Sequence, residues 1–195
     1  MSRRATIGYL TGLGAALLGG WVAFPHVLYQ SVEQPLQFSH ALHTGEKSGL
    51  SCQDCHSLGR DGRFAGIPGI ETCAPCHQEA QGKTADEKRL VEEYVSKGRE
   101  IAWLSYARQP QNVSFSHAQH VTLAGLTCER CHGPHGRSET LRPFERNRIS
   151  GYSRDIWGPS MSRLRRAEWE GMKMDDCSRC HHARGVRESC LDCHK

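Results

Sequence analysis

All ten cysteines of this 195-residue chain fall in one short pattern, Cys-Xaa-Xaa-Cys-His, which occurs five times. The five runs are Cys52/Cys55/His56, Cys73/Cys76/His77, Cys128/Cys131/His132, Cys177/Cys180/His181 and Cys190/Cys193/His194. The pattern is typical of covalent haem c attachment, in which the cysteines form thioethers with the porphyrin and the adjacent histidine binds one axial face of the iron. The sequence therefore predicts five covalently bound haem c groups, numbered haem 1 to haem 5 in chain order.

Zinc and disulfide bonds are the other common uses of paired cysteines. A four-cysteine zinc site uses such pairs two at a time, so five pairs leave one over, and zinc does not require a histidine after every pair. Disulfides within a Cys-Xaa-Xaa-Cys run would close strained local loops and leave the histidines unexplained. The spacing therefore favours haem over both alternatives.

A six-coordinate haem iron needs a second axial ligand, and an internal repeat supplies histidines for it. Residues 38–56 read FSHALHTGEKSGLSCQDCH, and residues 115–132 read FSHAQHVTLAGLTCERCH. Each copy contains a His-Xaa-Xaa-His pair followed by an attachment run. The two rings of a pair cannot both serve one iron whose other face is already occupied, so each pair is predicted to feed two haems.

The five proximal histidines leave seven others: His26, His40, His43, His117, His120, His135 and His182. By proximity in the chain, His40 is predicted to bind haem 1 and His117 to bind haem 3. His43 and His120 then reach haems attached elsewhere. His182 directly follows a proximal histidine and is predicted to bind a neighbouring haem. These five histidines complete five bis-histidine irons.

His26 and His135 are surplus to that count. They are interpreted as an interfacial histidine and a loop histidine, with the alternative that His135 displaces one of the five distal candidates. A further alternative has both help to hold a sixth haem without thioether bonds, because twelve histidines would fill six bis-histidine sites. Met172 and Met174, just before the fourth run, are secondary ligand candidates that would raise the potential of their haem.

The first thirty residues differ in character from the rest. Arg3 and Arg4 precede a long uncharged run that is just long enough to span a bilayer as a helix. The preceding positive charge predicts a cytoplasmic N-terminus and places everything after the run outside. A cleaved signal peptide is the competing interpretation, but no clear Ala-Xaa-Ala site follows. Residues 1–30 are therefore predicted to be a retained signal anchor, and residues 31–195 a single haem domain. The Gly-Xaa-Xaa-Xaa-Gly spacing in the anchor either reflects helix packing on a membrane partner or merely the abundance of glycine in such helices.

Hydrophobic residues make up 37% of the chain and aromatic residues 7%, which is lean for a self-sufficient apolar core. We expect a mostly α-helical fold with extensive loops, little or no sheet, and a core built on stacked haems. The formal charge of +4 is offset by the haem propionates, with which much of the arginine is expected to pair, so nucleic-acid binding is not predicted.

Two further helices are predicted between the attachment runs. One begins at a capping box formed by Thr84 and Glu87, carries an apolar stripe over residues 90–95 and stops at Gly98. Trp103, which follows it, is predicted to pack rather than to relay electrons. The second helix is expected over about residues 160–170, inside a basic stretch that is either a solvated, propionate-pairing face or a docking surface.

The repeat and the Cys-Xaa-Xaa-Cys-His-His run over residues 177–182 resemble the class III multihaem cytochromes c. In that family the first histidine of each pair binds the next haem, the second binds another haem, and the trailing histidine binds a third. This implies axial roles for His40, His43, His117, His120 and His182, and export of the haem domain to the periplasm.

With its N-terminal anchor and its stretch over residues 103–133, the chain is also similar to two more specific groups. One is the membrane-anchored multihaem subunit of the quinone reductase complex of sulfate reducers, described with six haems where this chain has five attachment runs. The other is the pentahaem subunit of alternative complex III. The first implies inner-membrane location, and as partners a membrane-integral quinone-binding subunit, an iron–sulfur subunit and a soluble periplasmic cytochrome c.

The leading hypothesis is thus an electron carrier that links a periplasmic cytochrome c to menaquinone reduction, rather than an enzyme in its own right. A haem enzyme would need an open iron position, often with lysine in place of the proximal histidine, and no Cys-Xaa-Xaa-Cys-Lys run occurs. Quinol oxidation, either as the subunit of alternative complex III or as a tethered quinol-dehydrogenase cytochrome, is the remaining alternative.

Overall fold

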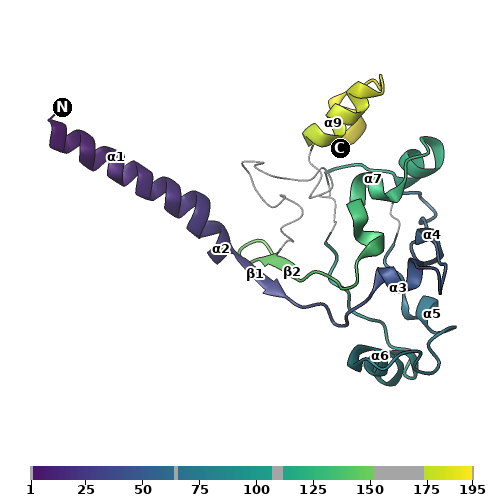
Figure 1. Cartoon of the computed structure of the whole chain (residues 1–195). Coiled ribbons are helices and arrows are strands. Elements are labelled where there is room, and N and C mark those ends of the chain that lie inside the picture. The colour runs from purple at the N-terminus through teal and green to yellow at the C-terminus, as the bar shows by residue number, and fades with distance from the viewer. Residues whose placement is uncertain (1, 64–65, 107–111, 152–173, 195) are drawn as a thin grey trace.

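The computed structural model describes residues 2–63, 66–106, 112–151 and 174–194. Within them the chain forms one long N-terminal helix followed by short helices and loops (Figure 1). The α-helices and strands are α1 Arg3–Leu18, α2 Phe24–Leu28, β1 Tyr29–Val32, α3 His40–Thr44, α4 Cys52–Cys55, α5 Ile70–Cys73, α6 Ala85–Arg89, α7 Cys128–His132, β2 Phe144–Asn147, α9 Met174–Ala183 and α10 Cys190–Cys193. The π-helical segments are Gly19–Ala23, Leu90–Val95 and Ala118–Leu123, and Gly133–Arg137 is a 3₁₀ helix.

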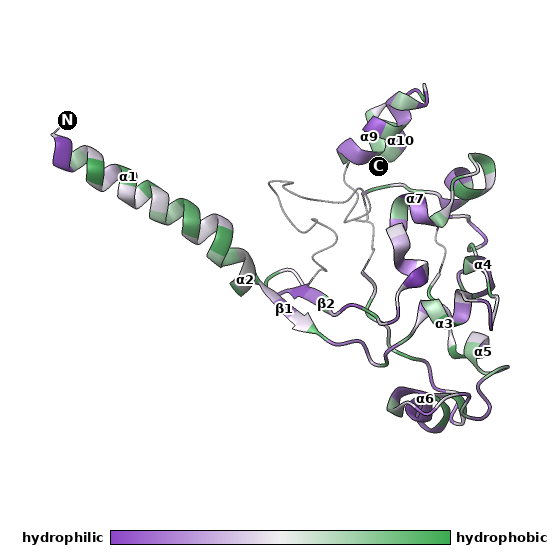
Figure 2. Cartoon of the chain, viewed as in Figure 1, coloured by the Kyte–Doolittle hydropathy of each residue, from purple (hydrophilic) through white to green (hydrophobic). Residues whose placement is uncertain are grey.

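Helix α1 and the π-helical segment after it form a continuous apolar rod that projects from the domain (Figures 1 and 2). Ser2 caps its start by accepting a hydrogen bond from the backbone N–H of Ala5 at 3.3 Å. The rod spans Arg3–Ala23, carries no charged residue after Arg4, and has no buried residue. By length and composition it is one candidate membrane span near the N-terminus.

A two-stranded antiparallel sheet joins the rod to the domain. Strand β1 pairs with β2 in a register that places Tyr29 opposite Asn147 and Val32 opposite Phe144. Phe144 and Asn147 are buried, and the backbone N–H of Arg148 donates to the carbonyl of Leu28. The mostly helical fold with little sheet is therefore confirmed among the described residues, while the helix predicted near residues 160–170 lies outside them.

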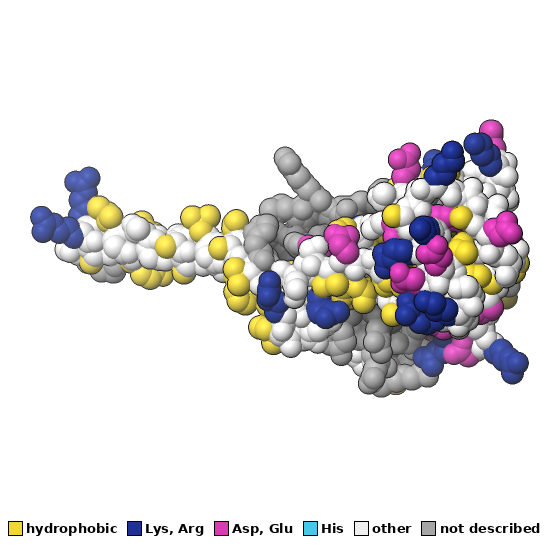
Figure 3. Space-filling model, turned by 90° about the horizontal axis from the view of Figure 1, so that it is seen from below, with side chains coloured by type: hydrophobic (Ala, Val, Ile, Leu, Met, Phe, Trp, Pro, Cys, Tyr) yellow, Lys and Arg dark blue, Asp and Glu magenta, His cyan; other side chains and the backbone are white. Residues whose placement is uncertain are grey.

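A small apolar cluster packs between α5 and the π-helical segment that follows α6. Its buried members are Leu36, Ile70, Tyr94 and Ile101. Trp103 packs against the cluster, as predicted. No side chain among the described residues is less than 2% exposed, so the protein part of the core is thin. Charged side chains of both signs are interspersed over the face of the domain seen in Figure 3.

The helix predicted from Thr84 is present as α6 and the π-helical segment that continues it. It ends in a turn at Gly98, which adopts the left-handed φ of 56° that favours glycine. The predicted capping box is half formed. Thr84 accepts a hydrogen bond from the backbone N–H of Glu87 at 3.1 Å, but the Glu87 carboxylate bonds other groups, described below.

Candidate functional site

Four of the five attachment runs form a helical turn that brings both thiols of the run to one face. Residues three apart in a helix share a face, so the Cys-Xaa-Xaa-Cys spacing suits such a turn. In α4 the side chain of Asp54 accepts from the backbone N–H of Ser51 at 2.6 Å, and in α10 Asp192 accepts from Ser189 at 2.7 Å. These capping boxes start the turns at the first cysteine. All ten cysteines are described and are free thiols, as thioether formation requires.

The second run differs from the other four, because its helix ends too early to include Cys76. Helix α5 ends at Cys73, and Cys76 lies in the turn that follows. The backbone N–H groups of Cys76 and His77 both donate to the Cys73 carbonyl, at 3.2 and 3.1 Å, which keeps the run compact without a continuous helix. Cys76 is exposed, whereas Cys73 is half-buried against the apolar cluster. Of the two predicted attachment thiols of haem 2, the protein thus encloses only Cys73, and attachment at Cys76 stays a prediction from the spacing.

Histidines far apart in the sequence face one another in three ring pairs. The ring centroids of His43 and His77 are 6.0 Å apart. Those of His117 and His132 are 6.3 Å apart with the planes within 4°, and those of His120 and His181 are 6.0 Å apart at 17°. Each pair joins a histidine of the repeat to a histidine of an attachment run.

The spacing of these pairs is that of an iron held between two imidazoles. Two iron–nitrogen bonds of about 2.0 Å each, with each ring centroid about 1 Å behind its nitrogen, separate the centroids by roughly 6 Å. Among the described residues, no three His, Cys, Asp or Glu side chains converge as a metal site. A porphyrin supplies four equatorial nitrogens itself, so an iron in it needs only two protein donors.

A fourth combination involves His40 and His56. Burial lowers the pKa of His40, and the nearby His56 lowers it further, followed by His135 and His43. The pKa of His135 is also lowered, by desolvation and then by the charge of Arg142. His40 thus lies near the proximal histidine of the first run, with His135 beside it.

Hydrogen bonds to Nδ1 orient most of these rings and leave Nε2 for a metal. Nδ1 of His43 and His120 donates to the carbonyl four residues earlier, Ser39 and Ser116, each at 2.8 Å. The remaining neutral acceptors are the Gly66 carbonyl for His56 at 2.8 Å, the Arg63 carbonyl for His117 at 2.8 Å and the Ser138 hydroxyl for His40 at 3.2 Å.

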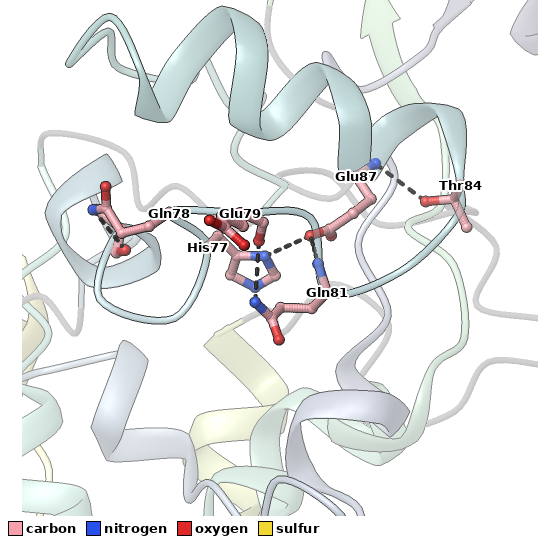
Figure 4. Close-up of polar contacts among 7 residues, drawn as sticks. His77, Gln78, Glu79, Gln81, Thr84 and Glu87 are labelled. Atoms are coloured by element: carbon pink, nitrogen blue, oxygen red, sulfur yellow. Dashed lines mark hydrogen bonds and ion pairs between the residues drawn. The ribbon is translucent and has the colours of Figure 1, made fainter.

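Two proximal histidines instead donate to carboxylates. Nδ1 of His77 lies 2.8 Å from Glu87 Oε1 (Figure 4), and Nδ1 of His181 lies 2.7 Å from Glu188 Oε1. A hydrogen bond from Ser178 holds the pKa of Glu188 below its usual range, and the hydrogen bond from His181 adds to this effect, although desolvation acts in the opposite direction. Sequence reasoning missed both carboxylates, and the only signal was an acidic residue seven to ten positions after the histidine.

The phenylalanine that begins each repeat packs on both histidines that follow it. Phe38 stacks on His43 with centroids 4.3 Å apart, and Phe115 stacks on His120 at 4.5 Å. Each phenylalanine also meets the first histidine of its own pair edge-on at 4.8 Å. The sequence repeat is therefore a structural repeat in which an aromatic ring holds both imidazoles in place.

Each repeat docks on the loop after the other repeat's attachment run. Ala41 N–H donates to the Ser138 carbonyl at 3.0 Å, in the segment after the third run. Reciprocally, Ala118 N–H donates to the Gly62 carbonyl at 2.9 Å, in the segment after the first run. Gly62 has a φ of 65°, and a Cβ there would lie 2.6 Å from Cβ of Ala118, so glycine is required at this contact.

Thiols of different runs are neighbours. Burial raises the pKa of several thiols, and in four of them a thiol from another run contributes to the rise. The neighbours are Cys73 with Cys55, Cys128 with Cys52, Cys131 with Cys180, and Cys177 with Cys193. In space the runs therefore follow the order second, first, third, fourth, fifth, which differs from their chain order.

The remaining predicted ligands are not paired in this way. His182 is exposed, and no ring contact joins it to another histidine in the described part of the chain. His194 has a backbone bridge to Val113. Met174 is 67% exposed at the start of α9. The His26 side chain and all of Met172 lie outside what the structure describes.

Comparison with known proteins identifies the family of the chain. The family model for the class III cytochrome c family matches residues 23–103. The chain is similar to a protein of Nitratidesulfovibrio vulgaris (strain Hildenborough) named "Menaquinone reductase, multiheme cytochrome c subunit". The two are 39% identical over 203 aligned residues, which cover 96% of this chain and 89% of the relative. Class III cytochromes bind haem c covalently, in keeping with the free, paired thiols. The chain therefore belongs to the same family as this multihaem cytochrome c subunit, and its residues 23–103 match the class III cytochromes c.

Proposed function

We propose that the chain is an electron-transfer subunit of a membrane-bound menaquinone reductase complex and carries five bis-histidine haem c groups. The observation that carries the proposal is the set of three histidine ring pairs at 6.0–6.3 Å, each with Nδ1 of the repeat histidine engaged. A haem iron with histidine on both faces exchanges electrons without binding a substrate.

The ring pairs support a specific set of distal ligands. His43 serves haem 2, His117 serves haem 3 and His120 serves haem 4, each opposite the proximal histidine of that run. His40, which lies near His56, serves haem 1. His182 is left for haem 5.

In this proposal the residues of the chain bind, orient and shield the cofactors. The turns of the attachment runs present the thiols, the Nδ1 hydrogen bonds set the ring orientations, and the phenylalanine of each repeat packs on its histidines. Each repeat ties its own segment to an attachment run elsewhere in the chain, so ligation also completes the thin core. Because neighbouring runs lie next to one another in space, successive haems would lie close together, as electron transfer from haem to haem requires.

The N-terminal rod supports membrane attachment. We propose that residues 1–30 anchor the protein in the inner membrane and that residues 31–195 form the periplasmic haem domain. The orientation follows from Arg3 and Arg4, which precede the apolar run. The menaquinone reductase assignment rests on the name of the relative. As partners we propose a quinone-binding membrane subunit and an iron–sulfur subunit, with a soluble periplasmic cytochrome c as the electron donor.

Three measurements test the proposal. A haem assay against protein mass should give five haems per chain, and EPR of the oxidised protein should show low-spin signals that nitrite and carbon monoxide leave unchanged. Purification in mild detergent should recover the chain with larger subunits. A large high-spin fraction, or a stable lone monomer, would contradict the ligand set or the complex, respectively.

A further inference from the structure

The Nδ1 hydrogen bonds divide the histidines of this site into two chemical classes. The distal rings of His43 and His120 donate to backbone carbonyls, as does the proximal ring of His56. The proximal rings of His77 and His181 donate to carboxylates at 2.8 and 2.7 Å. These two proximal rings belong to the pairs His43–His77 and His120–His181. In both pairs the distal ring donates to a backbone carbonyl and the proximal ring donates to a carboxylate.

Both carboxylates are held in place by a second donor. Oε1 of Glu87 also accepts from the backbone N–H of Gln81 at 2.8 Å (Figure 4), and Oε2 of Glu188 accepts from the Ser178 hydroxyl at 2.8 Å. The Glu87 side chain is 14% exposed and lies on His77, which is 13% exposed. The Glu188 contact is more open, with 28% of the carboxylate side chain exposed. These second donors restrict each carboxylate to the geometry that meets Nδ1.

The match between the two sites does not follow from the sequence repeat. The repeat supplies His43 and His120, whereas Glu87 lies ten residues after His77 and Glu188 only seven after His181. Glu87 belongs to the N-terminal turn of α6, and Glu188 to the loop between α9 and α10. Two different local structures therefore deliver the same carboxylate-to-imidazole contact.

We infer that Glu87 and Glu188 are positioning residues that lower the reduction potentials of haem 2 and haem 4 below the values that a neutral acceptor at the same place would give. A carboxylate that accepts a hydrogen bond from Nδ1–H makes the imidazole a stronger electron donor, which stabilises the oxidised iron more than the reduced iron. A neutral carbonyl does so less. The inference rests on the proposed haem sites and goes beyond them, because those sites leave the potentials open.

The test is a pair of single substitutions in the full-length, haem-loaded protein, Glu87→Gln and Glu188→Gln. Glutamine keeps the shape and an oxygen acceptor but removes the charge. Potentiometric titration followed by the haem absorbance and by low-spin EPR should show one component, one fifth of the haem, moving to higher potential. We expect about a tenfold rise in the reduced-to-oxidised ratio of that haem at a fixed potential, which is about 59 mV for one electron.

Glu129→Gln is the matched control. Glu129 lies within the third attachment run and pairs with Arg137 at 3.3 Å, and it has no contact with a histidine in the described part of the chain. The control therefore removes the same charge near a haem without touching an axial ligand. It should shift the titration less than the other two variants. Equal shifts in all three, or no shift in Glu87→Gln and Glu188→Gln, would overturn the inference.

A fourth variant covers the case in which glutamine disturbs the ligand. If Glu87→Gln loses low-spin haem, Glu87→Asp is the variant to measure, because it keeps the carboxylate. A restored low-spin signal at a potential near the wild-type value supports the inference. A restored low-spin signal at a raised potential overturns it. Failure of the proposed function looks different, because it would appear as high-spin or missing haem in the unmodified protein. Unchanged potentials in a fully low-spin protein would refute the carboxylate role alone.

Discussion

His120 provides the most specific test of how the two repeats interlock. Its ring lies 6.0 Å from that of His181, in the fourth attachment run, although the attachment run that follows His120 in the chain is the third. We therefore expect His120→Ala to remove the distal ligand of haem 4 and to leave haem 3 six-coordinate through His117 and His132. The loss is one axial nitrogen among ten, so one haem in five should become high-spin.

The assay is EPR and optical spectroscopy of the oxidised variant, which should show about one fifth of the haem as high-spin. Added imidazole should restore the low-spin signal, because the cavity left by the missing ring can admit the free ligand. His117→Ala is the matched control and should give the same fraction of high-spin haem at haem 3. The two variants are alike in composition and differ only in which ring pair they break.

A double-mutant cycle identifies the affected haem. In a variant that lacks haem 4 through Cys177→Ser and Cys180→Ser, His120→Ala should add no further high-spin signal. In a variant that lacks haem 3 through Cys128→Ser and Cys131→Ser, it should still add one. The opposite pattern, with the signal tied to haem 3, would refute the interlocking of the repeats.

Three further predictions concern the scaffold. Gly62→Ala should displace the second repeat, because the new Cβ would lie 2.6 Å from Cβ of Ala118, and it should appear as partial high-spin haem in the optical spectrum. Leu36→Ala should lower the free energy of unfolding by about 2–5 kcal/mol, because this side chain is 4% exposed in the apolar cluster. Denaturant unfolding monitored by haem absorbance measures this, and Leu123→Ala, at 81% exposed, should change it little. Replacing residues 1–30 by a cleavable signal peptide should release the haem domain from membranes in a fractionation assay with its low-spin spectrum intact, and continued sedimentation with membranes would count against the anchor.

The chemistry of the cofactor could be predicted from the sequence because it depends on local spacing. A Cys-Xaa-Xaa-Cys-His run places two thiols and one imidazole together through a single turn of backbone, whatever the rest of the chain does. The second run shows that the turn need not be a continuous helix, since Cys76 lies beyond the end of α5. The apolar N-terminal rod and the helix from Thr84 are equally local, and both are present as predicted. The repeat also predicts that each histidine pair serves two haems.

The partners of those histidines required the tertiary structure. The sequence left open which haems His43 and His120 reach, because a distal ligand lies across a contact between segments up to about sixty residues apart. In the structure the ring of His43 faces that of His77 and the ring of His120 faces that of His181, and these contacts depend on packing that no local pattern encodes.

The side chain of Glu87 shows the same difference between what local sequence predicts and what tertiary contacts decide. Its position three residues after Thr84 correctly predicts the start of a helix, because the Thr84 cap is a local interaction. The direction of its carboxylate depends instead on His77, because the fold brings Nδ1 of His77 within 2.8 Å of Oε1 of Glu87. Local spacing by itself therefore determines the haem attachment chemistry of this protein, while long-range packing decides which imidazoles face one another and which of them meet a negative charge.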